Sequence, residues 1–251
     1  MTKGKFNNQE GIFNPHSQRL KLTIIGVGSS GSFIALTLAK MGFKNITIQD
    51  FDIVELHNIP NQFYRMKDIG QLKVVALSNI IKEFTDVDVI YNTNKVDEST
   101  NSFLDLSLDR LYIICVDNVE TRRFIYSQLK DSPLTIIDGG LGGEEFHTQV
   151  FKMDNPEHQK IYEEYLKTPG KDTPCGMQNI IYTILSEAAE ICNIVKRIDK
   201  KEIIPEQIRR DMRSYRILTS FDYTNCVECG VTLNLDEEKE LGQCVQCENA
   251  S

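Results

Sequence analysis

The chain of 251 residues lacks the features that would place it in a membrane or on a nucleic acid. No apolar run approaches the ~20 residues that a membrane-spanning helix needs, and residues 1–10 contain no apolar core of a signal peptide. The formal net charge is -8, and this negative charge disfavours a nucleic-acid backbone as the main partner. We therefore expect a cytoplasmic protein that binds neither membrane nor nucleic acid.

Histidine is scarce as well, and the four histidines show no spacing typical of a metal site or a catalytic triad. The chain has no internal repeat and no low-complexity tract. It does have 41% hydrophobic residues, an ordinary value for a globular protein, arranged as short apolar strands that alternate with periodic helices. This alternation predicts an α/β fold, with a Rossmann-like, mostly parallel sheet, helices on both faces and antiparallel return strands.

The apolar pattern predicts the elements in order along the chain. Strands are expected at residues 20–25, 45–49, 87–91, 111–116, 134–138, 147–153 and 215–221, and helices at 30–41, 72–84, 118–129, 156–166 and 178–198. Gly139 and Gly140 are interpreted as a backbone bend after the fifth strand. The predicted organisation is an N-terminal extension (1–19), a nucleotide-binding domain (20–222) and a tail (223–251).

A glycine turn between the first strand and the first helix is the most informative motif. Gly26, Gly28 and Gly31 form a G-x-G-x-x-G pattern, and Asp50 and Asp52 follow at the end of the second strand. In this context the glycines let the backbone approach phosphate, the helix N-terminus faces phosphate, and a carboxylate faces ribose. The turn therefore predicts a site for an adenine nucleotide.

Further segments make this prediction more specific. Residues 50–62, followed by 70–73, resemble the signature of the ThiF/MoeB/HesA superfamily, the adenylating domain shared with ubiquitin-activating enzymes, and residues 115–122 resemble its Asp-Asn-x-x-x-Arg segment. The resemblance covers residues 20–151 well and the rest loosely. It implies that the chain uses ATP and Mg²⁺ to adenylate the C-terminal carboxylate of a ubiquitin-like or sulfur-carrier protein, and that it forms a homodimer.

The resemblance also implies roles for individual residues. Asp50 would bind the ribose hydroxyls, Lys73 would pair with the phosphates, and Asp117 would hold magnesium. The other nucleotide-binding candidates are Gly26, Gly28, Gly31, Asp52, Asn58, Asn61, Gln62, Arg65 and Asn118. From the residues alone, Lys73 could instead be a solvated surface lysine, and Asp117 with Asn118 could simply cap the following helix.

One position departs from the family pattern. Asn61 stands where family members usually carry an arginine that contacts the ATP phosphates, and asparagine supplies neither the charge nor the bidentate geometry of arginine. Arg65 is a candidate to reach back in its place. A nucleotide-binding interaction module with lost or altered activity is therefore an alternative to the adenylating enzyme. An NAD-dependent dehydrogenase is disfavoured, because it would leave Lys73 and Asp117 unexplained.

Four cysteines form two Cys-x-x-Cys pairs near the end of the chain. Cys226 and Cys229 are separated by 14 residues from Cys244 and Cys247. This spacing supplies four thiolates to one tetrahedral zinc ion, and it is favoured over a redox dithiol because no thioredoxin-like unit surrounds either pair. We expect a small C-terminal zinc ribbon with a structural role.

The other three cysteines differ in their surroundings. Cys115 lies in a predicted strand and Cys192 in an apolar helix, where cysteine usually behaves as a small buried apolar residue. Cys175 lies in a loop before the long helix. In family members that transfer the activated carboxylate, a cysteine on a comparable segment accepts the acyl group. Cys175 is thus either a possible acyl acceptor or a loop cysteine without a role.

Overall fold

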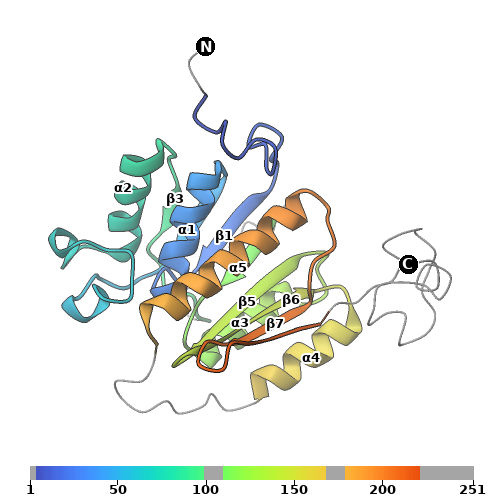
Figure 1. The fold of residues 1–251 in the computed structure, drawn as a ribbon. Coiled ribbons are helices and arrows are strands. Elements are labelled where there is room, and N and C mark those ends of the chain that lie inside the picture. The colour runs from blue at the N-terminus through green and yellow to red at the C-terminus, as the bar shows by residue number, and fades with distance from the viewer. Residues whose placement is uncertain (1–3, 99–109, 168–178, 221–251) are drawn as a thin grey trace.

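The computed structural model describes residues 4–98, 110–167 and 179–220 (Figure 1). These residues form one eight-stranded sheet with helices on both faces. Cys175 and the predicted zinc ribbon, with Cys226, Cys229, Cys244 and Cys247, lie outside the described residues. No helix in the described ranges is long and apolar enough to cross a membrane.

The strand order is β3-β2-β1-β4-β5-β6-β7-β8. Neighbours from β3 to β5 pair in parallel, and β6, β7 and β8 continue the sheet in antiparallel pairs. The strands are β1 (Lys21–Ile25), β2 (Ile46–Gln49), β3 (Ile90–Asn92), β4 (Arg110–Ile114), β5 (Thr135–Gly142), β6 (Glu145–Lys152), β7 (Gln207–Asp211) and β8 (Arg216–Ser220). The predicted mostly parallel sheet with antiparallel return strands is confirmed.

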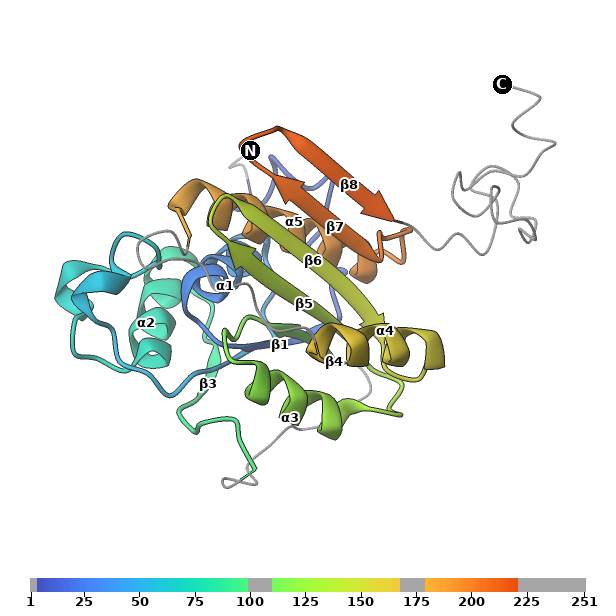
Figure 2. The same cartoon turned by 90° about the horizontal axis from the view of Figure 1, so that it is seen from below.

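The helices divide between the two faces of the sheet (Figure 2). One face carries α1 (Ser29–Met41), α2 (Lys73–Thr85) and α5 (Ile181–Asp199), and the other carries α3 (Val119–Leu129) and α4 (Pro156–Lys167). Two short 3-10 turns, η1 (Leu56–Asn58) and η2 (Met66–Asp68), lie in the connection between β2 and α2.

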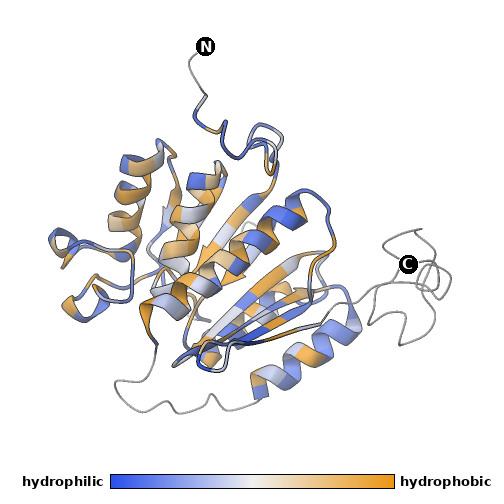
Figure 3. Cartoon of the chain, viewed as in Figure 1, coloured by the Kyte–Doolittle hydropathy of each residue, from blue (hydrophilic) through white to orange (hydrophobic). Residues whose placement is uncertain are grey.

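Two hydrophobic cores hold these layers together because successive strand residues point to opposite faces. Leu22 and Ile24 of β1 pack with α1, α2 and α5, whereas Ile25 packs in a second core with α3 and α4. In Figure 3, much of α2 is orange, the colour of hydrophobic residues, and most of α4 is blue, the colour of hydrophilic residues. The burial of β1 on both faces explains why apolar residues of this strand point to both sides of the sheet.

The structure corrects the interpretation of Gly139 and Gly140. Strand β5 runs through both residues to Gly142, and neither has a positive φ. Side chains packed on them require glycine instead. A Cβ atom on Gly139 would lie 2.8 Å from Oε1 of Glu187, and one on Gly140 would lie 2.2 Å from the His147 ring. The predicted bend is wrong, and the two glycines make room for these neighbours.

Two further differences concern strands. β3 covers Ile90–Asn92, whereas the sequence pattern predicted residues 87–91. β7 was not predicted at all, because its five residues include only one apolar residue, Ile208, and three charged ones. Charged side chains are tolerated there because β7 belongs to the antiparallel part of the sheet, where a strand can face solvent on one side.

Candidate functional site

The predicted nucleotide-binding residues follow three neighbouring strands at the same edge of the sheet. Gly26 comes directly after β1, Asp50 directly after β2, and Asp117 three residues after β4. β1 lies between β2 and β4, so the chain connections run in opposite directions from it. In open α/β sheets, ligands bind outside the carboxyl ends of the strands at such a point.

The three glycines of the turn are required for different reasons. Gly26 has φ +85, and a Cβ atom there would lie 2.6 Å from the carbonyl oxygen of Cys115. A Cβ atom on Gly31 would lie 2.0 Å from the carbonyl oxygen of Gly26. Both positions therefore need glycine for packing. Gly28 is different, because the atom nearest to its added Cβ is Nε2 of Gln62 at 3.7 Å. Space beside Gly28 remains at the N-terminus of α1.

Asp50 is fixed across the glycine turn by backbone hydrogen bonds. Its Oδ2 accepts from the N–H of Val27 at 2.8 Å, and its Oδ1 accepts from the N–H of Asp52 at 2.9 Å. Desolvation raises the pKa of Asp50, while these two N–H groups and the Lys73 ammonium oppose the rise. Each carboxylate oxygen can accept a further hydrogen bond. These two acceptor oxygens thus fit a ligand hydroxyl pair such as that of ribose.

Lys73 begins α2 and is buried, with 9% of its side chain exposed. Its Nζ lies 2.9 Å from Oδ2 of Asp52, and its backbone N–H donates to the carbonyl oxygen of Asp52 at 2.8 Å. The alternative of a solvated surface lysine is therefore wrong. The ammonium is held at the end of β2, where it offsets part of the rise that desolvation causes in the pKa of Asp50.

The connection between β2 and α2 folds against the glycine turn. Asn58 is buried and accepts the N–H of Glu55 through its Oδ1 at 2.9 Å. Tyr64 donates its hydroxyl to the carbonyl oxygen of Val27 at 2.6 Å. Gln62 has a buried Oε1 without a hydrogen-bond partner among the described residues. A buried acceptor of this kind usually has a partner, so Gln62 is a group available to a ligand.

The positive charge of Arg65 is committed within this connection. Its Nε lies 2.9 Å from Oδ2 of Asp68, and its Nη1 lies 2.5 Å from Oε2 of Glu83. Asn61 is half-buried and donates its backbone N–H to the carbonyl oxygen of Asn58. Arg65 as a replacement for the arginine that family members carry at the position of Asn61 stays a prediction. To contact phosphate in this way, Arg65 would have to leave the carboxylates of Asp68 and Glu83.

Asp117 and Asn118 differ in their surroundings. Asn118 caps α3, with its Oδ1 accepting from the N–H groups of Glu120 at 2.8 Å and Thr121 at 3.1 Å. Its predicted capping of the helix is confirmed, and its nucleotide binding stays a prediction. Asp117 is exposed, and the described ranges contain no group of three or more His, Cys, Asp or Glu side chains that could hold a metal ion. One carboxylate still fits Mg²⁺, which commonly keeps several waters and substrate phosphates as ligands.

Sequence reasoning missed a buried ion pair below this edge. Arg122 donates to the carboxylate of Asp138, which is fully buried, and to the carbonyl oxygens of Val116 at 2.6 Å and Gly139 at 2.9 Å. Tyr162 of α4 donates its hydroxyl to the same carboxylate. Arg122 thus fixes the end of β4 against β5. The signal in the sequence was the single charged residue, Asp138, inside an apolar run.

A second missed group is Glu187, a fully buried carboxyl on α5. It accepts a hydrogen bond from the hydroxyl of Ser30, which lies in the first turn of α1. Cys115 and Cys192 lie nearby, and burial raises the pKa of both thiols, as expected for cysteines packed as apolar residues. Glu187 interrupts the apolar stripe of α5, which was its sequence signal.

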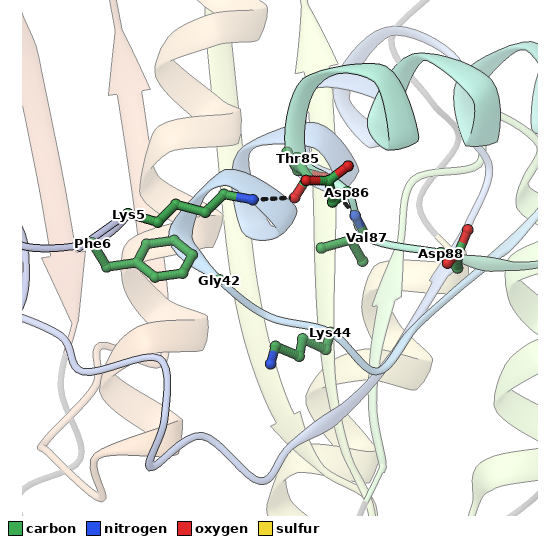
Figure 4. Close-up of a pocket in the computed structure, with 8 residues that line it drawn as sticks. All are labelled: Lys5, Phe6, Gly42, Lys44, Thr85, Asp86, Val87 and Asp88. Carbon is green, nitrogen blue, oxygen red and sulfur yellow. Dashed lines mark hydrogen bonds between the residues drawn. The ribbon is translucent and has the colours of Figure 1, made fainter. Parts of the chain in front are cut away.

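A surface depression of about 450 Å³ lies elsewhere, between the N-terminal segment and the ends of α1 and α2 (Figure 4). Its lining includes Lys5, Gly42 and Asp86. Gly42 follows the last residue of α1, whereas the glycine turn precedes the first, so the two places are a helix length of ~20 Å apart. This depression is therefore separate from the candidate nucleotide site.

Comparison with known proteins matches residues 15–232 to the ThiF family. The NEDD8-activating enzyme E1 catalytic subunit of Dictyostelium discoideum is 28% identical over 164 residues, which cover 59% of this chain and 36% of that protein. The tRNA threonylcarbamoyladenosine dehydratase of Haemophilus influenzae is 28% identical over 151 residues, covering 55% of this chain and 56% of that protein. The matched part of the chain thus spans 36% of the length of the first relative and 56% of the length of the second.

The fold recurs in solved structures. The crystal structure of E. coli MccB with AMPCPP and selenomethionine MccA has a TM-score of 0.71 to this chain and covers 88% of it and 72% of the MccB chain. The sequence identity is 12%, so this likeness shows a common fold alone.

Proposed function

Because the chain belongs to the ThiF family, we propose that it binds ATP with magnesium and adenylates the C-terminal carboxylate of a ubiquitin-like or sulfur-carrier protein. In this reaction a carboxylate oxygen attacks the α-phosphorus, the bond from that phosphorus to the oxygen bridging to the β-phosphate breaks, and pyrophosphate leaves with the electron pair. The products are an acyl adenylate and pyrophosphate. Positioning and charge neutralisation dominate catalysis of such a transfer.

The observation that carries this proposal is the gathering of the motifs at the carboxyl edge of β1, β2 and β4. Asp50 would accept the ribose hydroxyls, and the open space beside Gly28 would admit phosphate at the N-terminus of α1. Lys73 would exchange its contact with Asp52 for phosphate oxygens, and Asp117 would hold Mg²⁺, which neutralises phosphate charge when bound.

The comparisons support a protein or peptide C-terminus as the substrate class. One relative is named for activating NEDD8, and MccB was solved together with MccA and the nucleotide AMPCPP. The dehydratase relative is named for a modified tRNA, so the family is not restricted to protein substrates. The acidic net charge of this chain favours a protein partner over a tRNA.

Three finer proposals concern residues outside the described ranges or a second copy. We propose Cys175 as an acceptor of the activated acyl group, through attack of its sulfur on the acyl carbon and release of AMP. We propose that Cys226, Cys229, Cys244 and Cys247 bind one structural zinc ion. A homodimer, implied by family resemblance, is tested by sedimentation at several protein concentrations.

The test of the adenylation proposal is the exchange of labelled pyrophosphate into ATP in the presence of small carrier proteins and peptides with free C-termini. We expect exchange that needs both Mg²⁺ and a carboxylate. Asp117→Asn should lower the exchange rate by about 100-fold or more, because it removes a transition-state charge contact. Asp131→Asn is the matched control, since Asp131 is an exposed carboxylate at the other end of α3 and contacts Gln159.

A nucleotide-binding interaction module remains the second candidate, and Asn61 is the observation that favours it. If the chain binds ATP but catalyses no exchange with any carboxylate in the panel, the enzyme proposal is overturned and this alternative stands. If the chain binds no ATP, both are overturned.

A further inference from the structure

Glu187 brings a carboxyl group into the interior directly behind the candidate nucleotide site. The residue is fully buried, and its Oε2 accepts a hydrogen bond from Ser30 Oγ in the first turn of α1. Its Oε1 is buried and has no hydrogen-bond partner among the described residues. In the part of the chain that the structure describes, a single hydrogen bond thus serves a carboxyl group that has about four acceptor positions when ionised.

The packing around Glu187 is specific for this side chain. Gly139 of β5 faces it, and a Cβ atom at that position would lie 2.8 Å from its Oε1. The charged and titratable groups that act on it from neighbouring elements are Arg122 of α3 and the thiol of Cys115 after β4. Arg122 favours the ionised form, but it is already paired with Asp138.

Burial outweighs these favourable contacts and raises the pKa of Glu187 to about 7. The group therefore exchanges its proton near neutral pH. The contact with Ser30 can persist in both forms, because a protonated carboxyl donates to the hydroxyl oxygen and an ionised one accepts from it. Protonation then changes the charge behind α1 without requiring a change in the position of α1.

That charge matters because a buried anion and a bound phosphate would act on the same helix end. The N-terminus of α1 carries the partial positive charge that would attract phosphate. An ionised Glu187 lies one hydrogen bond from the first turn of this helix, inside the protein where screening is weak. A nucleotide phosphate and this carboxylate would repel each other.

We propose that Glu187 becomes neutral when a nucleotide occupies the glycine turn, so that nucleotide binding takes up a proton at Glu187. This inference rests on the proposed nucleotide-binding function. By linkage, a group that binds a proton on ligand binding makes the affinity fall as pH rises. The neutral carboxyl hydrogen-bonded to Ser30 is the form that accepts nucleotide.

The experiment measures binding of Mg-ADP by calorimetry between about pH 6 and about pH 8, in two buffers that differ in ionisation enthalpy. The proteins are the wild type, Glu187→Gln and the control Glu190→Gln. Glutamine keeps an oxygen that accepts from the Ser30 hydroxyl, has an N–H group that can donate to it, and carries no charge. Glu190 is half-buried on the same helix and contacts Asn193 at 3.4 Å. Titration of the nucleotide itself is common to all three proteins and cancels in the comparison.

From the lower to the upper pH, we expect the nucleotide affinity of the wild type and of Glu190→Gln to fall. The fall in the affinity of Glu187→Gln should be smaller by a factor of about three to ten. At the upper pH, Glu187→Gln should bind more tightly than the wild type and take up less proton. Equal pH dependence and equal proton uptake in the wild type and Glu187→Gln would overturn the inference. Absence of nucleotide binding in all three proteins would instead overturn the proposed function.

A second variant keeps the inference testable if Glu187→Gln does not fold. Ser30 lowers the pKa of Glu187 through its hydrogen bond, so Ser30→Ala should move the midpoint of the pH dependence upward. A midpoint that stays in place or moves downward contradicts the assignment of the proton to Glu187. A purely structural role of Ser30 would change the affinity at every pH by the same factor.

Discussion

Glu187→Gln should change how the stability of the free protein depends on pH. In the folded state burial raises the pKa of Glu187 from the ordinary 4.5 to about 7. The folded protein therefore binds this proton more tightly than the unfolded chain does. Glutamine at the same position has no proton to lose, so the variant lacks this contribution to the pH dependence.

The direction in which stability changes with pH follows from the linkage between proton binding and folding. Stability from the protonated carboxyl is fully present below about pH 4.5, and it is lost as pH rises toward about pH 7, because an ionised carboxylate is then buried. A pKa rise from 4.5 to about 7 corresponds to about 3 kcal/mol of unfolding free energy. Relative to the wild type, Glu187→Gln should therefore gain about 3 kcal/mol in stability between about pH 4.5 and about pH 7.5.

Urea unfolding at a series of pH values, without nucleotide, measures this difference. Glu190→Gln serves as the control because it removes an equal charge from the same helix, and its difference from the wild type should stay nearly constant. A difference in stability between Glu187→Gln and the wild type that does not change with pH, or that shrinks as pH rises, would contradict a raised pKa of Glu187 in the folded protein. Because no ligand is present, this result is independent of the proposed enzyme activity.

The remaining predictions concern the glycine turn, the buried ion pair and the tail. Gly31→Ala should lower the unfolding free energy by about 2 to 3 kcal/mol more than Gly28→Ala in chemical denaturation, because only the first places a methyl group against a backbone oxygen. Arg122→Met should cost about 3 to 5 kcal/mol by leaving Asp138 buried without its partner, whereas Arg123→Met, at an exposed position, should cost less than about 1 kcal/mol. Metal analysis of the purified chain should find one zinc per chain, and serine at the four tail cysteines should abolish it; no zinc in the intact chain would contradict the ribbon.

The sequence predicts the central parallel strands β1, β2 and β4 well because these strands are mostly buried on both faces. The apolar run 111–114 of β4 and the apolar residues on both faces of β1 leave few other interpretations, and the glycine turn fixes the connection from β1 to α1. The candidate site follows from the same motifs, since residues after parallel strands meet at one edge. β7 shows the limit, because a strand with charged residues on its open side has no comparable apolar signal.

Tertiary contacts explain what the sequence does not reveal. Gly139 and Gly140 suggest a bend locally, but they are glycine because Glu187 and His147 occupy the space of their missing side chains. The contact between Ser30 and Glu187 joins positions 157 residues apart. Spacing within a motif carries no information about such a pair, so Glu187 could be recognised only as an acidic residue in an apolar stripe.

Because β1 pairs with β4, which lies far along the chain, the parts of the site are synthesised at different times. Residues 21–25 lie in register with residues 110–114, and the carbonyl of Cys115 closes against Gly26. A chain emerging from the ribosome therefore carries the glycine turn long before the strand that shapes one wall of it exists. Glu187 arrives later still, with α5. Contacts of such long range slow folding, so the turn takes its final form only after the residues of β4 and α5 have been synthesised.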